Sequence, residues 1–139
     1  MMDRETLDKM FVISGINKTK LHESLRQLGP PPKKGKDLWN PDRPTTGYCY
    51  VVSEVVSYAL KSNSVEHKVF RLNLENGESH WFIRLGKEGD GEIVDLTADQ
   101  IDDIYEYKKA KRKGFNKNKH MKYGMSDKAE ELAKMMQII

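Results

Sequence analysis

The sequence predicts an α+β domain in which helices pack against a small antiparallel sheet. Apolar residues recur at helical spacing near both ends of the chain and again after the single cysteine. Between these segments the apolar period is two, and Asn76-Gly77 and the run "GKEGDG" are typical hairpin turns. With 139 residues, the chain has the length of one domain with its own core.

Residues 1–30 are predicted to be an N-terminal helical segment, with one or two helices over residues 3–28 and a break near Gly15. The positions that carry the helical spacing are Leu7, Met10, Phe11, Leu21, Leu25 and Leu28. The stretch "GPPPKKGKD" ends this segment because proline and glycine interrupt helices. Residues 31–37 are therefore expected to be a linker into a domain over residues 38–139.

A further helix is predicted to begin at Cys49 and to end near the run "KSNS". Its apolar face is formed by Val52, Val55, Val56, Ala59 and Leu60. Three antiparallel strands are expected next, at about residues 67–74, 79–85 and 92–96. The run "TADQ" has capping-box spacing and predicts a helix from about Ala98, and Ser126 is expected to cap a last helix.

The predicted strands bring a histidine and an aspartate together. If the turn of the second hairpin centres between Lys87 and Glu88, His80 lies directly opposite Asp95. A register change of two residues would leave them diagonal neighbours, whereas a change of one would put them on opposite faces. An imidazole beside a carboxylate is the arrangement that orients a catalytic base.

Cys49, His80 and Asp95 are therefore the expected catalytic residues, as nucleophile, general acid–base and orienting group. A helix start and an adjacent imidazolium both favour the thiolate form of a cysteine. Gly47 permits close approach or a positive φ before the thiol. Such a site attacks amide, ester or thioester carbonyls. The structural alternative is a small buried Cys49 and an Asp95 that only caps the following helix.

Further residues are candidates for binding the substrate or its oxyanion. Asn40 and Gln100 carry amides that donate hydrogen bonds, and the backbone N–H of Cys49 is free in the first helical turn. Trp81 is a candidate pocket wall, with a core position as its alternative. Glu54 either lines the site or belongs to a buried polar pair that supports the helix.

The segments "NPDRPTTGYC", "SHWFIRL" and "GEIVDLTADQ" resemble the YunG-like family of small bacterial and phage proteins. The matching positions are Asn40, Pro41, Gly47, Cys49, His80, Trp81, Asp95, Leu96, Thr97 and Gln100. The resemblance covers about residues 38–136. It implies a papain/transglutaminase-like fold, in which a helix with Cys49 at its start packs on the sheet. Many relatives have Gln before the cysteine, where this chain has Tyr48.

The segment 108–122 is a basic loop. Its candidate polyanion-binding residues are Lys108, Lys109, Lys111, Arg112 and Lys113. Clustered lysines bind nucleic acid by releasing counterions, although such runs are also ordinary solvated surface. The alternative to an enzyme is therefore a papain-like binding module, phage-encoded, that engages nucleic acid or a host protein through this loop.

Composition limits the other classes of function. A single cysteine excludes an internal disulfide and, with four scattered histidines, does not match zinc-finger spacing. No metal or organic cofactor is expected, and the partner of an enzyme would be an acyl substrate, either a small molecule or a protein. No apolar run is long enough for a membrane span, and no signal peptide is visible. The cytoplasm is the expected location, that of the host if the protein is phage-encoded.

Overall fold

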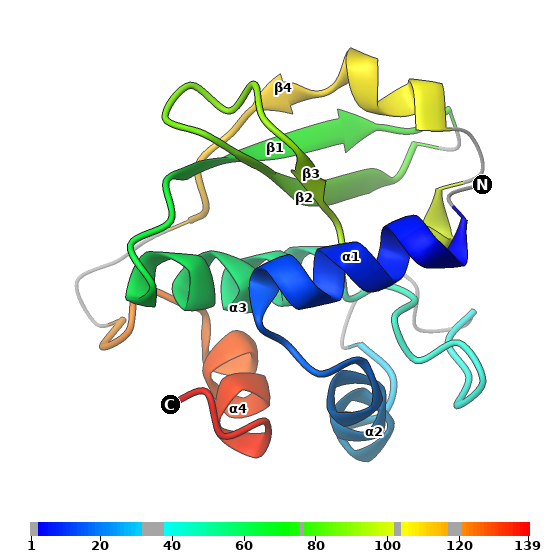
Figure 1. Ribbon diagram of the computed structural model, residues 1–139. Helices are drawn as coiled ribbons and strands as arrows, with labels where there is room; N and C mark the ends of the chain where they lie inside the picture. The colour runs from blue at the N-terminus through cyan, green and yellow to red at the C-terminus, as the bar shows by residue number, and fades with distance from the viewer. Residues whose placement is uncertain (1–2, 32–37, 76, 102–103, 117–120) are drawn as a thin grey trace.

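The computed structural model describes residues 3–31, 38–75, 77–101, 104–116 and 121–139. These residues form four α-helices and one antiparallel sheet of four strands in the order β3-β2-β1-β4, so the α+β prediction is confirmed. Figure 1 shows the sheet above, α1 and α3 directly beneath it, and α2 and α4 farther below. Most of the predicted linker, residues 32–37, lies outside the described residues.

The N-terminal segment contains two helices, α1 (Arg4–Ser14) and α2 (Lys18–Leu28). Gly15 ends α1 with a φ of 71°, a left-handed conformation that favours glycine. Asp3 and Asn17 cap the two helices, each accepting a backbone N–H through its side chain. The break near Gly15 is thus confirmed, with two helices rather than one.

Helix α3 (Cys49–Ser62) is the central helix, and its start and end match the sequence prediction. It packs against β2 on one side and α4 (Asp127–Met135) on the other. Ser126 caps α4 by accepting the N–H of Ala129, as expected from the sequence. The main core lies between the sheet and the helices, because the apolar faces of all four helices point into it.

The sheet is built on the hairpin of β1 (His67–Asn73) and β2 (Ser79–Leu85), as predicted. Strand β3 (Ile93–Val94) is shorter than the predicted 92–96, because the Asp95 side chain accepts the N–H of Thr97 and turns the chain away. Strand β4 (Lys111–Arg112) pairs with β1 and was not predicted. Both residues of β4 are charged, so the strand has no apolar alternation from which it could be predicted.

The segment after β3 forms two short 3₁₀ helices, η1 (Ala98–Gln100) and η2 (Ile104–Lys109). The predicted capping box is wrong: Thr97 makes no side-chain cap, because its hydroxyl donates to Asp95 instead. A second apolar cluster lies here and contains Leu72, Phe82, Ile101 and Tyr107. Within the described residues, none of the helices combines the length and apolar character needed to cross a bilayer.

Candidate active site

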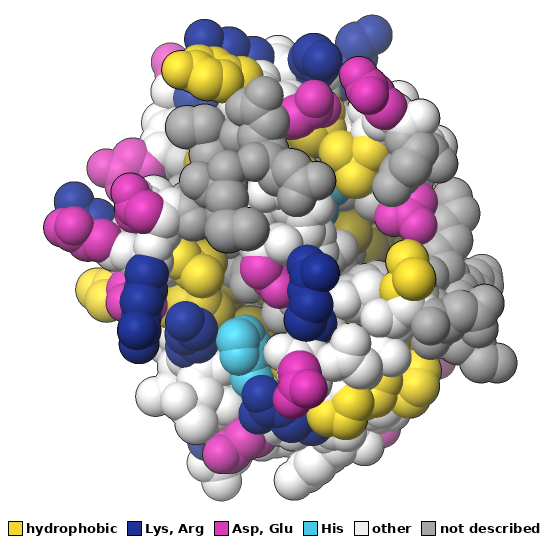
Figure 2. Space-filling view, turned by 90° about the vertical axis from the view of Figure 1, so that its right-hand side faces the viewer, with side chains coloured by type: hydrophobic (Ala, Val, Ile, Leu, Met, Phe, Trp, Pro, Cys, Tyr) yellow, Lys and Arg dark blue, Asp and Glu magenta, His cyan; other side chains and the backbone are white. Residues whose placement is uncertain are grey.

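Cys49 occupies the first position of α3 and is 7% exposed, just beneath the surface. A backbone N–H at this position has no acceptor within its own helix. Gly47, two residues earlier, has a φ of 78°, so the predicted positive φ is confirmed and a side chain there would be strained. The amino-terminal end of α3 points toward the face drawn in Figure 2, where acidic and basic side chains surround a hollow.

His80 and Asp95 form a direct hydrogen bond, with 2.6 Å between Nε2 and Oδ2, and both are almost completely buried. The β2–β3 register pairs Ile83 with Val94, so the hairpin centres between Glu88 and Gly89 rather than one residue earlier. The predicted direct opposition is therefore wrong by two residues. The two side chains meet as diagonal neighbours, because a shift of two keeps them on one face.

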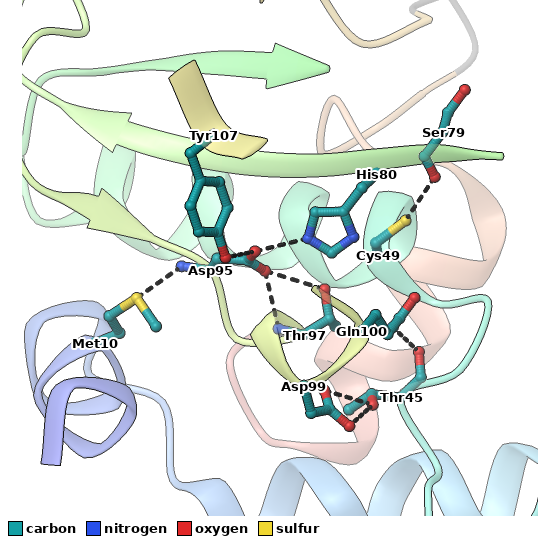
Figure 3. Close-up of polar contacts among 10 residues, drawn as sticks. All are labelled: Met10, Thr45, Cys49, Ser79, His80, Asp95, Thr97, Asp99, Gln100 and Tyr107. Atoms are coloured by element: carbon teal, nitrogen blue, oxygen red, sulfur yellow. Dashed lines mark hydrogen bonds and ion pairs between the residues drawn. The ribbon is translucent and has the colours of Figure 1, made fainter. Parts of the chain in front are cut away.

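Asp95 is held by donors on both carboxylate oxygens. Oδ1 accepts the N–H and the hydroxyl of Thr97, each at 3.1 Å, and Oδ2 accepts the Tyr107 hydroxyl at 2.6 Å. Its own N–H donates to Sδ of Met10 in α1, at 3.2 Å. Figure 3 shows how three separate segments converge on this one carboxylate. A carboxylate so engaged has little freedom to rotate away from His80.

Electrostatics favour the protonated form of His80. Burial alone lowers its pKa, but the charge of Asp95, the hydrogen bond to it and the contact with Cys49 outweigh burial and raise the pKa to about 10. His80 is therefore an imidazolium at neutral pH. Because Asp95 engages Nε2, Nδ1 is the nitrogen directed toward the thiol in Figure 3.

The thiol has a second neighbour at the end of β2. Sγ of Cys49 lies 3.6 Å from the Ser79 carbonyl oxygen, a weak contact that suits a protonated S–H. The Ser79 hydroxyl in turn accepts two hydrogen bonds from the Arg71 guanidinium, at 2.7 and 3.0 Å. The sulfur thus lies between the His80 ring and the Ser79 carbonyl.

A loop–turn clasp, formed by Arg43, Thr45, Asp99 and Gln100, fixes the approach to α3. The Thr45 hydroxyl bonds the Asp99 carboxylate at 2.8 and 2.9 Å, and Nε2 of Gln100 donates to the Thr45 carbonyl at 2.5 Å. Arg43 adds a bond to the Asp99 carbonyl at 3.0 Å. Gln100, a predicted oxyanion donor, uses its amide to hold this loop. Its oxyanion role stays a prediction.

Asn40 and Trp81 lie away from the thiol's immediate contacts. Asn40 is exposed, and its Oδ1 accepts the N–H groups of Asp42 and Arg43, which makes a local turn. Trp81 points to the opposite face of β2 from His80, since alternate residues of a strand face opposite ways. Its ring packs edge-on against Tyr50 and stacks on Phe115. No described contact links either residue to Cys49.

Glu54 does not contact the three central residues in any described hydrogen bond. It is 1% exposed, and its carboxylate accepts the hydroxyl of Ser126 at 2.6 Å and the N–H at 2.9 Å. Burial raises the pKa of Glu54, and the two bonds from Ser126 offset part of this rise. Of the two sequence alternatives, the supporting role is the one these contacts match. Tyr48 is also structural, with its ring in the core and its hydroxyl donating to Gly29.

Two neighbours of Asp95 lack a clear sequence signal. The capping-box spacing predicts Thr97 as a helix cap, although an aspartate two residues before a threonine is typical of a side-chain turn. Tyr107 gives no signal, because it directly precedes the basic segment 108–122. Burial, followed by the charge of Asp95, raises the pKa of Tyr107, so its hydroxyl remains a donor.

The basic candidates lie on η2, on β4 and just beyond it, and residues 117–120 of the predicted loop lie outside the described residues. Lys109 pairs with Glu106 at 3.6 Å and Arg112 with Glu88 at 3.8 Å. Lys108 lies over the Tyr105 ring, and Lys111 and Lys113 are exposed. Among described residues, no three His, Cys, Asp or Glu side chains are grouped as metal ligands would be.

Comparison with known proteins identifies no relative of this chain. No protein-family model, no curated protein and no solved structure matches the chain. The resemblance to the YunG-like family therefore stays a prediction from the quoted motifs, and the site has to be interpreted from its own chemistry.

Proposed function

We propose that the protein is a cysteine-dependent hydrolase or acyltransferase with Cys49 as nucleophile, His80 as general acid–base and Asp95 as the orienting group. The observation that carries the proposal is the buried His80–Asp95 hydrogen bond beside a thiol at a helix start. Arranged this way, the imidazolium faces Sγ through Nδ1 and is held from behind through Nε2. Such a pair favours a thiolate at neutral pH.

In the acylation step, a sulfur lone pair forms a bond to the substrate carbonyl carbon, and the π electrons move to the oxygen. The backbone N–H of Cys49 is the nearest helix-start donor for that oxyanion. The adduct collapses when the bond to the leaving group breaks, and His80 transfers its proton to that group. The product of this half-reaction is a thioester on Cys49 and a neutral His80.

In the second step, neutral His80 removes a proton from water or from another acceptor, which attacks the thioester carbon. Collapse of this adduct breaks the C–S bond and returns the thiolate–imidazolium pair. Water as the acceptor gives hydrolysis, and an amine, alcohol or thiol gives acyl transfer. Asp95 keeps the ring in place through both steps because Thr97 and Tyr107 hold its carboxylate.

The proposal includes a papain/transglutaminase-like arrangement and membership of the YunG-like family. It is supported by the chain order of the three residues, with the thiol at a helix start and the other two on or directly after strands of one sheet. A reducing cytoplasm, that of the host for a phage-encoded protein, suits a function that depends on one unpaired cysteine.

The test is alkylation of Cys49 by iodoacetamide at pH 6, followed by intact-protein mass spectrometry. An ordinary thiol has a pKa of about 8.5 and is ionised in fewer than about 1 in 100 molecules at that pH. Wild-type protein is expected to react about 100-fold faster than free cysteine, and His80→Ala is expected to lose that advantage.

A matched control is His67→Ala, which removes another histidine from the same hairpin. His67 bonds Ser57 and the Val65 carbonyl, not the thiol, so this variant should react at the wild-type rate. If wild-type Cys49 reacts no faster than free cysteine, the enzyme proposal is wrong, and the fold serves binding alone.

A further inference from the structure

The edge of the sheet at β1 and β4 concentrates positive charge from separate parts of the chain. The cations are Lys68, Arg71, Lys109, Lys111, Arg112 and Lys113, which together define the basic groove. Figure 1 places β4 along the edge of the sheet beside β1, at the top of the molecule. Four of the six belong to the basic segment 108–122. The other two, Lys68 and Arg71, lie in β1, which pairs with β4.

The groove consists of two adjoining hollows. One, of about 630 Å³, is lined by Lys68, Arg112 and Lys113 together with Phe115. The other, of about 190 Å³, is lined by Arg71, Lys109 and Lys111. Lys113 lines both hollows, so they adjoin at this residue. By strand alternation Arg71 and Lys111 share one face of the sheet, whereas Lys68 and Arg112 lie on the other. A chain-like ligand on the first face would meet Arg71, Lys111 and Lys113.

The strand register makes this clustering costly without a ligand. Arg71 and Lys111 are direct cross-strand partners, and like charges directly opposite each other destabilise a sheet. Lysine on an edge strand also blocks unwanted strand pairing, which accounts for Lys111. Arg71, in the inner strand β1, also donates two hydrogen bonds to Ser79 and lies over the Trp81 ring. A bound anion between the two strands would remove the repulsion.

Two described ion pairs involve cations of the groove. Glu88 approaches Arg112 at 3.8 Å and Glu106 approaches Lys109 at 3.6 Å. Exposed pairs of this kind contribute little and are readily exchanged for a stronger anion. Phosphate oxygens would replace them with several charge-assisted hydrogen bonds.

We propose that the basic groove binds single-stranded nucleic acid, with phosphates on its lysines and arginines and a base against Phe115. Nucleic acid is favoured over an acidic protein because aromatic rings accompany the cations. Phe115 lines the larger hollow, and Trp81 stacks on Phe115 while lying under the Arg71 guanidinium. Alternating cations and aromatic faces are how single strands are held without sequence preference. The groove adjoins the thiol through Arg71, which bonds Ser79, but the binding proposed for it uses no thiol chemistry.

The test is fluorescence anisotropy of a labelled oligothymidine of about 15 nucleotides, titrated at about 50 mM and about 200 mM KCl. The groove variant is Lys111→Gln with Lys113→Gln. It is expected to bind about tenfold more weakly at the lower salt, with a log–log salt slope smaller by about 1.4. The matched control, Arg4→Gln with Lys9→Gln in α1, removes the same charge and should bind within about twofold of wild type.

A second variant separates stacking from charge. Phe115→Leu keeps an apolar side chain and should weaken binding about fivefold while leaving the salt slope unchanged. Thermal melting of each variant checks that it is folded. The proposal is overturned if the α1 control loses as much affinity as the groove variant, if wild type shows no salt-sensitive binding, or if polyglutamate displaces the oligonucleotide at equal charge concentration.

Discussion

Asp95 and Glu54 are both buried carboxylates, at 2% and 1% exposure, yet their surroundings differ. Asp95 has a cationic partner, the His80 imidazolium, and three further contacts from Thr97 and Tyr107. Among the described residues, the hydrogen-bond donors to Glu54 are the hydroxyl and N–H of Ser126, which are neutral. A buried charge without a countercharge tends to take up a proton. The first environment therefore gives its carboxylate a charged partner, whereas burial in the second raises the pKa of Glu54.

This difference distinguishes a carboxylate of the proposed active site from one that joins two helices. Asp95 bonds His80, which itself contacts the thiol proposed as the nucleophile. Glu54 ends at the first turn of α4 and joins that helix to α3. Burial of a carboxylate therefore does not by itself indicate a catalytic role in this fold. The residue to which the carboxylate is bonded distinguishes the two cases.

The largest expected effect comes from matched amide substitutions at the two carboxylates. Asp95→Asn removes the charge that faces a buried imidazolium, and we expect a loss of about 3 kcal/mol in the free energy of unfolding. Glu54→Gln keeps an acceptor for Ser126 and should cost no more than about 1 kcal/mol. Urea unfolding at pH 7 measures both. Equal losses of unfolding free energy in the two variants would contradict the proposed difference between the two environments.

The pH dependence of stability should have the same sign for both groups, because both pKa values are raised, but it should fall in different pH windows. His80 has a folded pKa of about 10 against an ordinary 6.5, so its contribution is complete below about pH 6.5 and is lost as pH rises toward 10. Glu54 has a raised pKa, so its protonation stabilises the fold as pH falls from neutral toward 4.5. Urea unfolding from pH 5 to 10 should show the alkaline loss flattened by Asp95→Asn and the acid gain flattened by Glu54→Gln. Unchanged profiles would contradict both assignments.

The smallest effects are expected from removing one hydroxyl at each carboxylate. Tyr107→Phe deletes a donor to Asp95, and Ser126→Ala deletes one to Glu54; each should cost about 1 kcal/mol. Only Tyr107→Phe is expected to slow the alkylation of Cys49 at pH 6, because Ser126 is not linked to the thiol. Tyr105→Phe, at a residue 66% exposed, is the control. Slower alkylation in Ser126→Ala would show that the two regions are coupled.

Periodicity predicted most of the fold. The spacing of Leu21 and Leu25, the valines of α3 and the alternation around Leu72 all gave the right element types, because burial of one face imposes a repeat. Lys111 and Arg112 carry no such repeat, since β4 is held by backbone pairing with β1 and its side chains are exposed. Strand β4 is therefore not predictable from apolar periodicity.

The sequence predicts the residues of the candidate site but not the strand register or the contacts that hold the carboxylates. His80 and Asp95 were paired from alternation, which is insensitive to a register change of two residues. Turn geometry decides the register, and the three glycines of "GKEGDG" allow more than one turn. Tyr107 and the partner of Glu54 were invisible, because the contacts span 12 and 72 residues and leave no local pattern.

The loop–turn clasp has a consequence for how the protein folds. Its bonds join residues 54, 55 and 56 positions apart, across nearly the whole of α3 and the hairpin. Closing a loop of that length costs chain entropy before any bond in the clasp forms. The two ends are therefore expected to meet after the intervening helix and strands have formed. If the thiol has the reactivity proposed for it, that reactivity is a late marker of folding.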